Sequence, residues 1–197
     1  MALRPAYLKF IHDCIDATLM DVDEKYILEL GNQHIIHINT DIKEKSGKAY
    51  FTNRGFFHTS IDLNKKDGAL PLDLSQVHDI PEWYNRFDII TSSGTTEHVE
   101  PYEAQYECFT NLHNWLKPGG IIVHIVPRVE ELETKGSCNN YYSERFYQML
   151  CEKKNNKLIA AEVINDPNMS LFGRYIWRAR DLIKIAIRRL KIFLGRI

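Results

Sequence analysis

The chain has 197 residues, of which 44% are hydrophobic and 26% charged, and its formal net charge is −1. This composition is that of an ordinary soluble globular protein with one substantial core, and the charges scattered through its first twenty residues argue against a signal peptide. Four widely spaced cysteines argue against a zinc site or a disulfide framework, and together with the lack of a bilayer-length apolar run they favour a cytoplasmic protein.

Helical and strand patterns alternate through the first half of the chain. Apolar residues at helical spacing predict a helix over residues 5–20, and the apolar run at 25–31 predicts a buried strand. A short helix is predicted after Ser46, its N-cap, with Gly55 just beyond its end. Residues 56–63 predict a second strand. Pro71 limits residues 68–75 to a short or edge strand.

The same alternation continues in the second half. Residues 86–93 and 119–127 predict two strongly buried strands, separated by a helix over 102–116. A helix over 143–154, capped by Ser143, and a strand over 157–164 follow. Strands that alternate with helices predict an α/β fold with a mostly parallel sheet covered on both faces.

The C-terminal segment is strongly basic. Residues 174–197 carry eight Lys or Arg and one acid, so residues 1–173 carry a net charge of −8. The apolar residues of this segment share one arc of a helical wheel, which predicts a basic amphipathic helix. We therefore divide the chain into a domain at 1–173 and a helix at 174–197. Residues 178–197 could pack on the body, mediate self-association or lie on an anionic membrane surface, and nucleic-acid contact has less support.

Polar residues gather where four of the predicted strands end. These ends are Glu29 to Gly31, Asp62, Asp73 and residues 91–94. Ligands bind at the carboxyl ends of parallel strands, so the four ends could form one crevice. Asp62 is placed to accept hydrogen bonds from both hydroxyls of a ribose, although a turn role would also suit it. Asp73 at a second strand end favours the binding role.

Residues 112–127, LHNWLKPGGIIVHIVP, resemble the fifth-strand segment of class I S-adenosylmethionine-dependent methyltransferases. YILELG, HTSIDLN and FDIITSSGTTEHV resemble the family's first, second and fourth strands, in the same order along the chain. The resemblance implies a Rossmann-like, doubly wound, mostly parallel seven-stranded sheet with helices on both faces and an antiparallel last strand. It also implies that S-adenosylmethionine is the cofactor.

The resemblance places particular residues against the cofactor and the substrate. The predicted cofactor-binding residues are Glu29, Gly31, Asn32, Asp62, Leu63, Asp73, Leu74, Ser92 and Ser93. Glu97 and His98 follow the fourth strand, where the family contacts substrate. His98 is a candidate general base, since an imidazole pKa of about 6.5 suits neutral pH, and a structural role at a helix start is an equal alternative.

The first loop departs from the family pattern. Gly31 matches the family's first glycine, but Asn32, Gln33 and His34 stand where further glycines are usual. Either the amides of Asn32 or Gln33 bind the cofactor in place of bare backbone, or the fold has lost turnover. The polar residues kept at the other strand ends favour the first interpretation.

Other chemistries have weaker support. His34 and His37 are spaced three apart, but the surrounding isoleucines disfavour a helix, so we predict a polar loop and no metal site. Phosphate-loop, nucleophile-elbow and three-glycine dinucleotide motifs are absent from the sequence. We expect methyl transfer from S-adenosylmethionine to a small-molecule or glycan acceptor. The alternative is a catalytically silent protein of the same fold that acts as a binding or scaffolding subunit.

Overall fold

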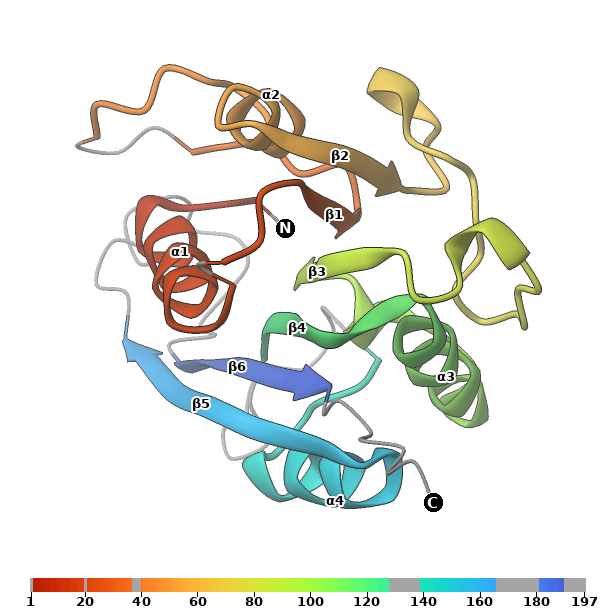
Figure 1. The fold of residues 1–197 in the computed structure, drawn as a ribbon. Helices are drawn as coiled ribbons and strands as arrows, with labels where there is room; N and C mark the ends of the chain where they lie inside the picture. The colour runs from red at the N-terminus through yellow and green to blue at the C-terminus, as the bar shows by residue number, and fades with distance from the viewer. Residues whose placement is uncertain (1, 20, 37–39, 128–138, 166–180, 190–197) are drawn as a thin grey trace, which may run out of the picture.

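The computed structural model describes residues 2–19, 21–36, 40–127, 139–165 and 181–189. A single sheet with the strand order β2-β1-β3-β4-β6-β5 runs through the middle of the molecule (Figure 1). Its strands are β1 (Lys25–Leu30), β2 (Phe56–Ile61), β3 (Phe87–Ser93), β4 (Leu116–Pro127), β5 (Asn156–Asn165) and β6 (Asp181–Arg189). The strand order reverses direction between β1 and β3, which makes their carboxyl ends a topological switch point.

The sheet is mostly parallel, as predicted. β1 pairs in parallel with both β2 and β3, and β3 pairs in parallel with β4. β6 runs antiparallel to β4 and to β5, so the last strand of the described chain is the reversed one. The Rossmann-like doubly wound architecture is therefore confirmed. In place of a seventh strand, the described residues show a parallel bridge between Ile61 and Leu70, where Pro71 interrupts the edge.

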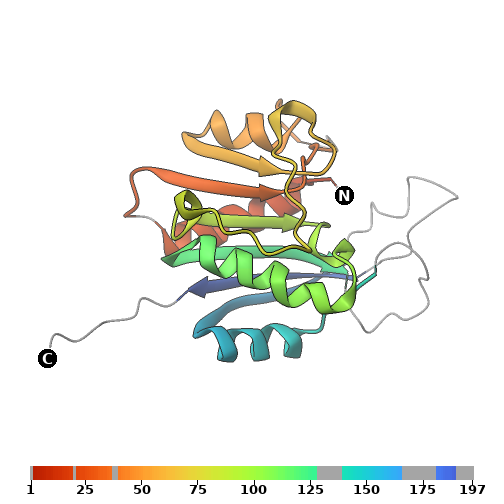
Figure 2. The ribbon, with the colours of Figure 1, turned by 90° about the vertical axis from the view of Figure 1, so that its right-hand side faces the viewer.

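Helices lie on both sides of the sheet in Figure 1, and Figure 2 looks onto one of the two faces. One face carries α1 (Pro5–Thr18) and α2 (Gly47–Thr52), and the other carries α3 (Gln105–Trp115) and α4 (Glu144–Lys154). The predicted caps are confirmed: Ser46 Oγ accepts the Ala49 N–H at 3.2 Å, and Ser143 Oγ accepts the Phe146 N–H at 3.1 Å. These side chains satisfy N–H groups that a helix start leaves without partners.

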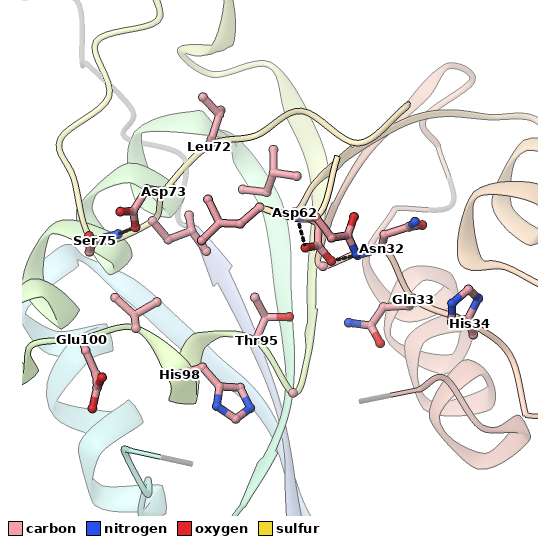
Figure 3. A pocket seen from close by; sticks show the side chains of 17 residues that line it. Asn32, Gln33, His34, Asp62, Leu72, Asp73, Ser75, Thr95, His98 and Glu100 are labelled. Carbon is pink, nitrogen blue, oxygen red and sulfur yellow. Dashed lines mark hydrogen bonds between the residues drawn. The ribbon is translucent and has the colours of Figure 1, made fainter. Parts of the chain in front are cut away.

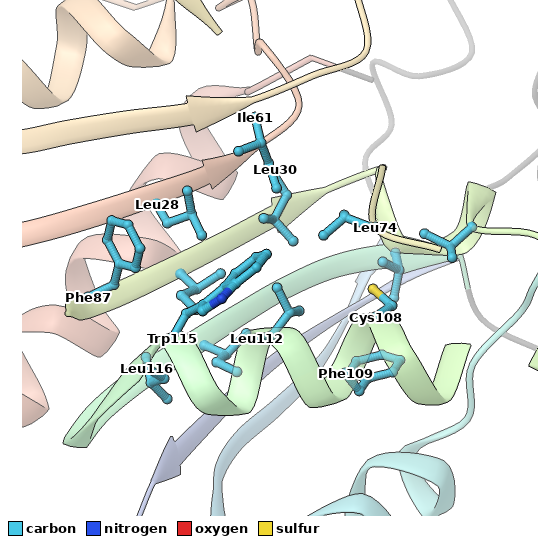
Figure 4. Packing of buried hydrophobic residues seen from close by; sticks show 14 of the residues in the cluster. Leu28, Leu30, Ile61, Leu74, Phe87, Cys108, Phe109, Leu112, Trp115 and Leu116 are labelled. Carbon is cyan, nitrogen blue, oxygen red and sulfur yellow. The ribbon is translucent and has the colours of Figure 1, made fainter. Parts of the chain in front are cut away.

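The core between α3 and the sheet is built from residues that the sequence pattern marked as apolar. Trp115, Leu112 and Cys108 lie fully buried along one side of α3. They pack against strand residues that include Leu28 and Phe87 (Figure 4). Every residue of β3 is buried, as expected for a central parallel strand covered on both faces. The core thus fixes the strand ends that carry the polar residues.

The predicted C-terminal amphipathic helix is wrong for the part of it that the structure describes. Residues 181–189 form β6, which is hydrogen-bonded between β4 and β5. The sequence DLIKIAIRR places isoleucines at alternate positions 183, 185 and 187, and β-branched residues favour strands. Residues 174–180 and 190–197 lie outside the described residues.

The position of β6 changes the predicted organisation of the chain. Residues 181–189 belong to the same sheet as β1–β5, so they are not a separate appendage to a domain at 1–173. The predicted membrane-surface and self-association roles of residues 178–197 were argued from an amphipathic helix, whereas residues 181–189 form a strand. Both roles stay predictions. Within the described part of the chain, no helix is both long and apolar enough to cross a membrane.

Candidate cofactor and substrate site

A cavity of about 570 Å³ opens at the carboxyl ends of β1, β2 and β3. Its walls come from the segment after β1, the loops after β2 and at 72–75, and the turn after β3. Figure 3 shows Asp62 on one side of this space and Thr95 and His98 on the other. Seven predicted site residues line it: Gly31, Asn32, Asp62, Leu63, Asp73, Leu74 and His98. The switch point of the sheet therefore brings most of the predicted site together.

Asp62 is held firmly at the end of β2. Its Oδ2 accepts the backbone N–H of Asn32 at 2.8 Å, and its Oδ1 accepts the backbone N–H of Asn64 at 2.9 Å. A carboxylate has about four acceptor positions, so each oxygen can take a further hydrogen bond. The Asp62 carboxylate can therefore stabilise the turn after β2 and still accept hydrogen bonds from two ribose hydroxyl groups. The turn role and the binding role expected for Asp62 are compatible.

Gly31 adopts a left-handed backbone with φ = 84°, which suits glycine. A Cβ at this position would lie 2.5 Å from Gln33 Nε2 and 2.8 Å from Thr95 Oγ1. Those two groups both donate to the carbonyl of Leu30, at 3.3 Å and 2.8 Å. The Gln33 and Thr95 side chains thus fill the space beside Gly31 at the end of β1.

The amide nitrogens of the variant loop already have protein partners. Asn32 Nδ2 donates to Asp67 Oδ2 at 2.8 Å and to the Lys66 carbonyl at 3.2 Å. Gln33 Nε2 is directed to the Leu30 carbonyl, and the Gln33 side chain is buried. Asn32 lines the cavity, but its amide nitrogen holds the loop after β2.

Acidic and apolar groups share the rest of the cavity wall. Asp73 is exposed, and its Oδ1 accepts the Ser75 N–H at 2.9 Å. Leu74 is buried beside it, whereas Leu63 is 65% exposed at the rim. Asp62, Asp73 and Glu100 line the cavity, and none of its described lining residues is Lys or Arg. This charge distribution suits a cationic or neutral ligand.

His98 and Glu97 have different environments although they are adjacent in sequence. His98 lies in the short turn η3 (Thr96–His98), is exposed and lines the cavity. Surrounding protein atoms partly desolvate the imidazole and lower the pKa of His98. Glu97 is fully buried and is not among the lining residues, and burial raises the pKa of its carboxyl to about 7. Neither carboxyl oxygen has a hydrogen-bond partner within the described part of the chain.

Comparisons with known proteins point to one fold. A family model described as a methyltransferase domain matches residues 46–124, a range that begins at the cap of α2 and leaves out the Gly31 loop. No curated protein matches the chain by sequence. The Burkholderia thailandensis 1,6-didemethyltoxoflavin-N1-methyltransferase, solved with 1,6-didemethyltoxoflavin and S-adenosylhomocysteine, is similar in structure. It has a TM-score of 0.62 and 13% identity, over 92% of this chain and 78% of that one.

Two further solved structures extend the likeness. The N-methyltransferase NodS of Bradyrhizobium japonicum WM9 gives a TM-score of 0.60 at 14% identity, over 95% of this chain and 98% of that one. The [4+2]-cyclase SpnF gives 0.57 at 14% identity, over 94% and 81%. The chain has the class I methyltransferase fold. The fold that the strand motifs implied is thereby confirmed.

Three of the residues that the sequence predicted to bind the cofactor do not line the cavity. Glu29 is buried within the sheet, where its Oε2 lies 2.8 Å from His58 Nε2. Ser92 is buried, and its Oγ contacts Thr96 Oγ1 at 3.4 Å. Ser93 is also buried, and its Oγ has no partner among the described residues. All three sit on β1 or β3 rather than in the loops that follow them.

Sequence reasoning did not single out Thr95 or Asp67. Thr95 lies in the turn after β3 and lines the cavity of the methyltransferase fold. The polar run TSSGTT was the available signal, but it did not show which hydroxyl would face the cavity. Asp67 is 35 residues from Asn32, its partner in the first loop, so no local pattern could connect them.

Proposed function

We propose that the chain transfers a methyl group from S-adenosylmethionine to a small-molecule or glycan acceptor. The observation that carries this proposal is the convergence of Asp62, Asp73 and Gly31 with His98 around one cavity at the sheet's switch point. A nucleoside cofactor and an acceptor need such a shared space, because the reacting atoms must meet in line. The match of residues 46–124 to a methyltransferase domain supports the same reading.

The groups of this cavity fit the parts of S-adenosylmethionine. The Asp62 oxygens each keep acceptor capacity for a ribose hydroxyl. Asp73 can accept from the amino group of the adenine, and Leu74 and Val99 supply apolar contact for its ring. Acidic lining without Lys or Arg among the described residues suits the sulfonium and ammonium charges. The neighbours solved with S-adenosylhomocysteine support this assignment.

The chain's own residues have two tasks in such a reaction. Gly31, Asp62 and Asp73 would hold S-adenosylmethionine, which would supply an electrophilic methyl group for transfer from its sulfur to an acceptor oxygen or nitrogen. Gly31, Asp62 and Asp73 orient the nucleoside, which is a contribution of positioning rather than of bond chemistry. His98 is neutral at pH 7 because its pKa is lowered, so its imidazole can accept the proton that the acceptor loses.

A small-molecule acceptor has indirect support. One similar structure holds the small molecule 1,6-didemethyltoxoflavin together with S-adenosylhomocysteine. The cavity of this chain is of the size that encloses small ligands rather than a macromolecular surface. We propose a small-molecule acceptor on this basis, with a glycan as the second choice.

Calorimetry on the full chain tests the proposal. We expect S-adenosylmethionine and S-adenosylhomocysteine to bind with heat and to raise the melting temperature. If neither binding heat nor a change in melting temperature is seen at millimolar ligand, the proposed methyltransferase function is ruled out. If binding is seen, a screen of amines, phenols and oligosaccharides with labelled methyl donor then identifies the acceptor.

The alternative is a silent protein that binds a ligand without methyl transfer. It is favoured by the side chains of Gln33 and Thr95, which pack the end of β1 at Gly31. The likeness to SpnF, described as a [4+2]-cyclase, also shows that this fold carries chemistry other than methyl transfer. Tight binding of S-adenosylhomocysteine without methyl transfer to any acceptor class would favour this alternative.

A further inference from the structure

The loop after β2 folds back onto the loop after β1 through one aspartate. Asp67 Oδ2 accepts a 2.8 Å hydrogen bond from Asn32 Nδ2, and the Asp67 carbonyl accepts one of 2.8 Å from Lys48 Nζ. The Asn32 N–H in turn donates to Asp62 Oδ2. We call Asn32, Lys48 and Asp67 the loop clasp. It joins the end of β1, the start of α2 and the loop after β2 around the Asp62 carboxylate.

The backbone of the clasp loop is shaped to bring Asp67 to Asn32. Lys65, Asp67 and Gly68 all have left-handed backbones, with φ values of 58°, 52° and 81°. Left-handed backbone costs free energy in most residues, and Asp tolerates it better than most. The turn is reinforced by the Asn64 side chain, whose Oδ1 accepts the Lys66 N–H at 2.7 Å. An exposed loop that keeps such a conformation places the Asp67 carboxylate at one defined point.

The clasp acts on Asp62 through Asn32. The Asn32 side chain is fixed by Asp67 and by the Lys66 carbonyl, so the Asn32 backbone N–H has a fixed direction. That N–H occupies one acceptor position of Asp62 Oδ2 and so sets which positions of the carboxylate remain open. After Gly31 the sequence has no further glycine up to residue 46, and the Asn32 side chain beside the cavity is held by its hydrogen bonds to Asp67 and to the Lys66 carbonyl.

We propose that Asp67 is a positioning residue that, through Asn32, orients the Asp62 carboxylate toward the two ribose hydroxyls of the cofactor. This role rests on the proposed function, because it needs a ribose at Asp62. A purely structural clasp would stabilise the loop without altering how the site distinguishes a ribose from a deoxyribose. The two roles therefore differ in a measurable quantity, the ratio of dissociation constants for the two sugars.

The experiment compares 5′-deoxy-5′-methylthioadenosine with its 2′,3′-dideoxy counterpart by calorimetry on the full chain. Asp67→Gly removes the carboxylate and keeps a residue that accepts the left-handed backbone. Asp67→Asn keeps both an oxygen acceptor for Asn32 and tolerance of that backbone. Lys48→Met removes the second anchor of Asp67. Asp79→Ala is the matched control, since Asp79 is exposed and lies outside the cavity lining.

We expect the wild-type chain to prefer the ribose ligand and Asp67→Gly to reduce that preference roughly three- to tenfold, the effect of one hydrogen bond. Lys48→Met should reduce it less, and Asp67→Asn and Asp79→Ala should keep it. A preference unchanged in Asp67→Gly, even with a lowered melting temperature, would overturn the positioning role alone. If the wild-type chain bound neither S-adenosylhomocysteine nor the ribose ligand, the result would contradict both the proposed function and the positioning role of Asp67.

Discussion

Glu29 and His58 form a buried pair between neighbouring strands, with Glu29 Oε2 and His58 Nε2 2.8 Å apart. Their side chains are only 2% and 1% exposed. Burial raises the pKa of the Glu29 carboxyl, and the His58 hydrogen bond opposes that shift. A Cβ on Gly47 would lie 2.2 Å from Glu29 Oε1, so α2 begins directly against this carboxyl group. Glu29 thus supports the first loop from inside the sheet.

The burial of this pair predicts a large stability effect. Glu29→Ala and His58→Ala should each lower the free energy of unfolding by about 3 kcal/mol, because each leaves a buried polar partner unpaired. Lys9 and Asp13 provide the control, since their 2.7 Å ion pair lies on the surface with side chains 75% and 56% exposed. Asp13→Ala should cost less than about 1 kcal/mol. Equal losses at the two sites in urea unfolding would contradict the structural role of Glu29.

The buried Glu97 carboxyl predicts a pH-dependent stability. Its folded pKa of about 7 lies above the ordinary value of 4.5, so its contribution is fully present below pH 4.5 and is lost as the pH rises to 7. The difference in unfolding free energy between Glu97→Gln and the wild type should therefore change by about 3 kcal/mol between pH 4 and pH 8, in favour of the variant at high pH.

Glu100→Gln is the matched control for this titration, because Glu100 is an exposed carboxylate three residues away. Because the effect at Glu97 comes from burial, Glu100→Gln should not reproduce the change expected for Glu97→Gln over the same pH range. Urea unfolding at half-unit steps of pH gives both curves. A flat curve for Glu97→Gln would mean that the Glu97 carboxyl gains hydrogen-bond donors in solution.

Asp62 is predicted to hold the ribose of the cofactor. Asp62→Ala should weaken binding of S-adenosylhomocysteine by roughly 1.5–3 kcal/mol, because it removes charge-assisted hydrogen bonds. Asp62→Asn should lose less, since it keeps one acceptor oxygen. Calorimetry measures both affinities, and an unchanged affinity in Asp62→Ala would reduce Asp62 to a turn residue that accepts the N–H groups of Asn32 and Asn64.

His98 is predicted to accept the acceptor's proton. With an acceptor found by screening, His98→Ala should lower turnover by about 10²–10⁴-fold and leave the affinity for S-adenosylhomocysteine nearly unchanged. Because the pKa of His98 is lowered, the wild-type rate should rise with pH below about 6.5 and level off above it. Turnover by His98→Ala at the wild-type rate would mean that His98 has only a structural role in the turn after β3.

The chain should not fold without β6. A chain that ends at residue 180 lacks the strand between β4 and β5, so the edges of both would lose their hydrogen-bonded partner. We expect loss of the cooperative unfolding transition measured by circular dichroism. A chain that ends at residue 189 keeps β6 and is the matched control. A folded, ligand-binding protein ending at residue 180 would instead support an independent C-terminal segment.

The order of helices and strands in the described chain up to residue 165 was largely determined by the sequence by itself. Ser46 and Ser143 were predicted as caps because a short side-chain oxygen before an apolar run satisfies a helix start, and both accept the expected N–H groups. Gly31, Asp62 and Asp73 were predicted to share one site because parallel strands end at the same edge, and the family resemblance added His98 to it. They line one cavity.

Only the tertiary structure decided features that depend on contacts between distant segments. The apolar residues of 181–189 fit one arc of a helical wheel, which predicted a helix. In the folded chain this segment lies between β4 and β5 and forms hydrogen bonds with both strands, and these bonds outweigh a helical preference. Glu97 and His98 are adjacent in sequence, yet the turn after β3 buries the first and exposes the second. Asn32 looked free to bind a ligand, but Asp67, 35 residues away, takes its amide nitrogen. Side-chain direction and pairing partner are set by packing, which local sequence does not encode.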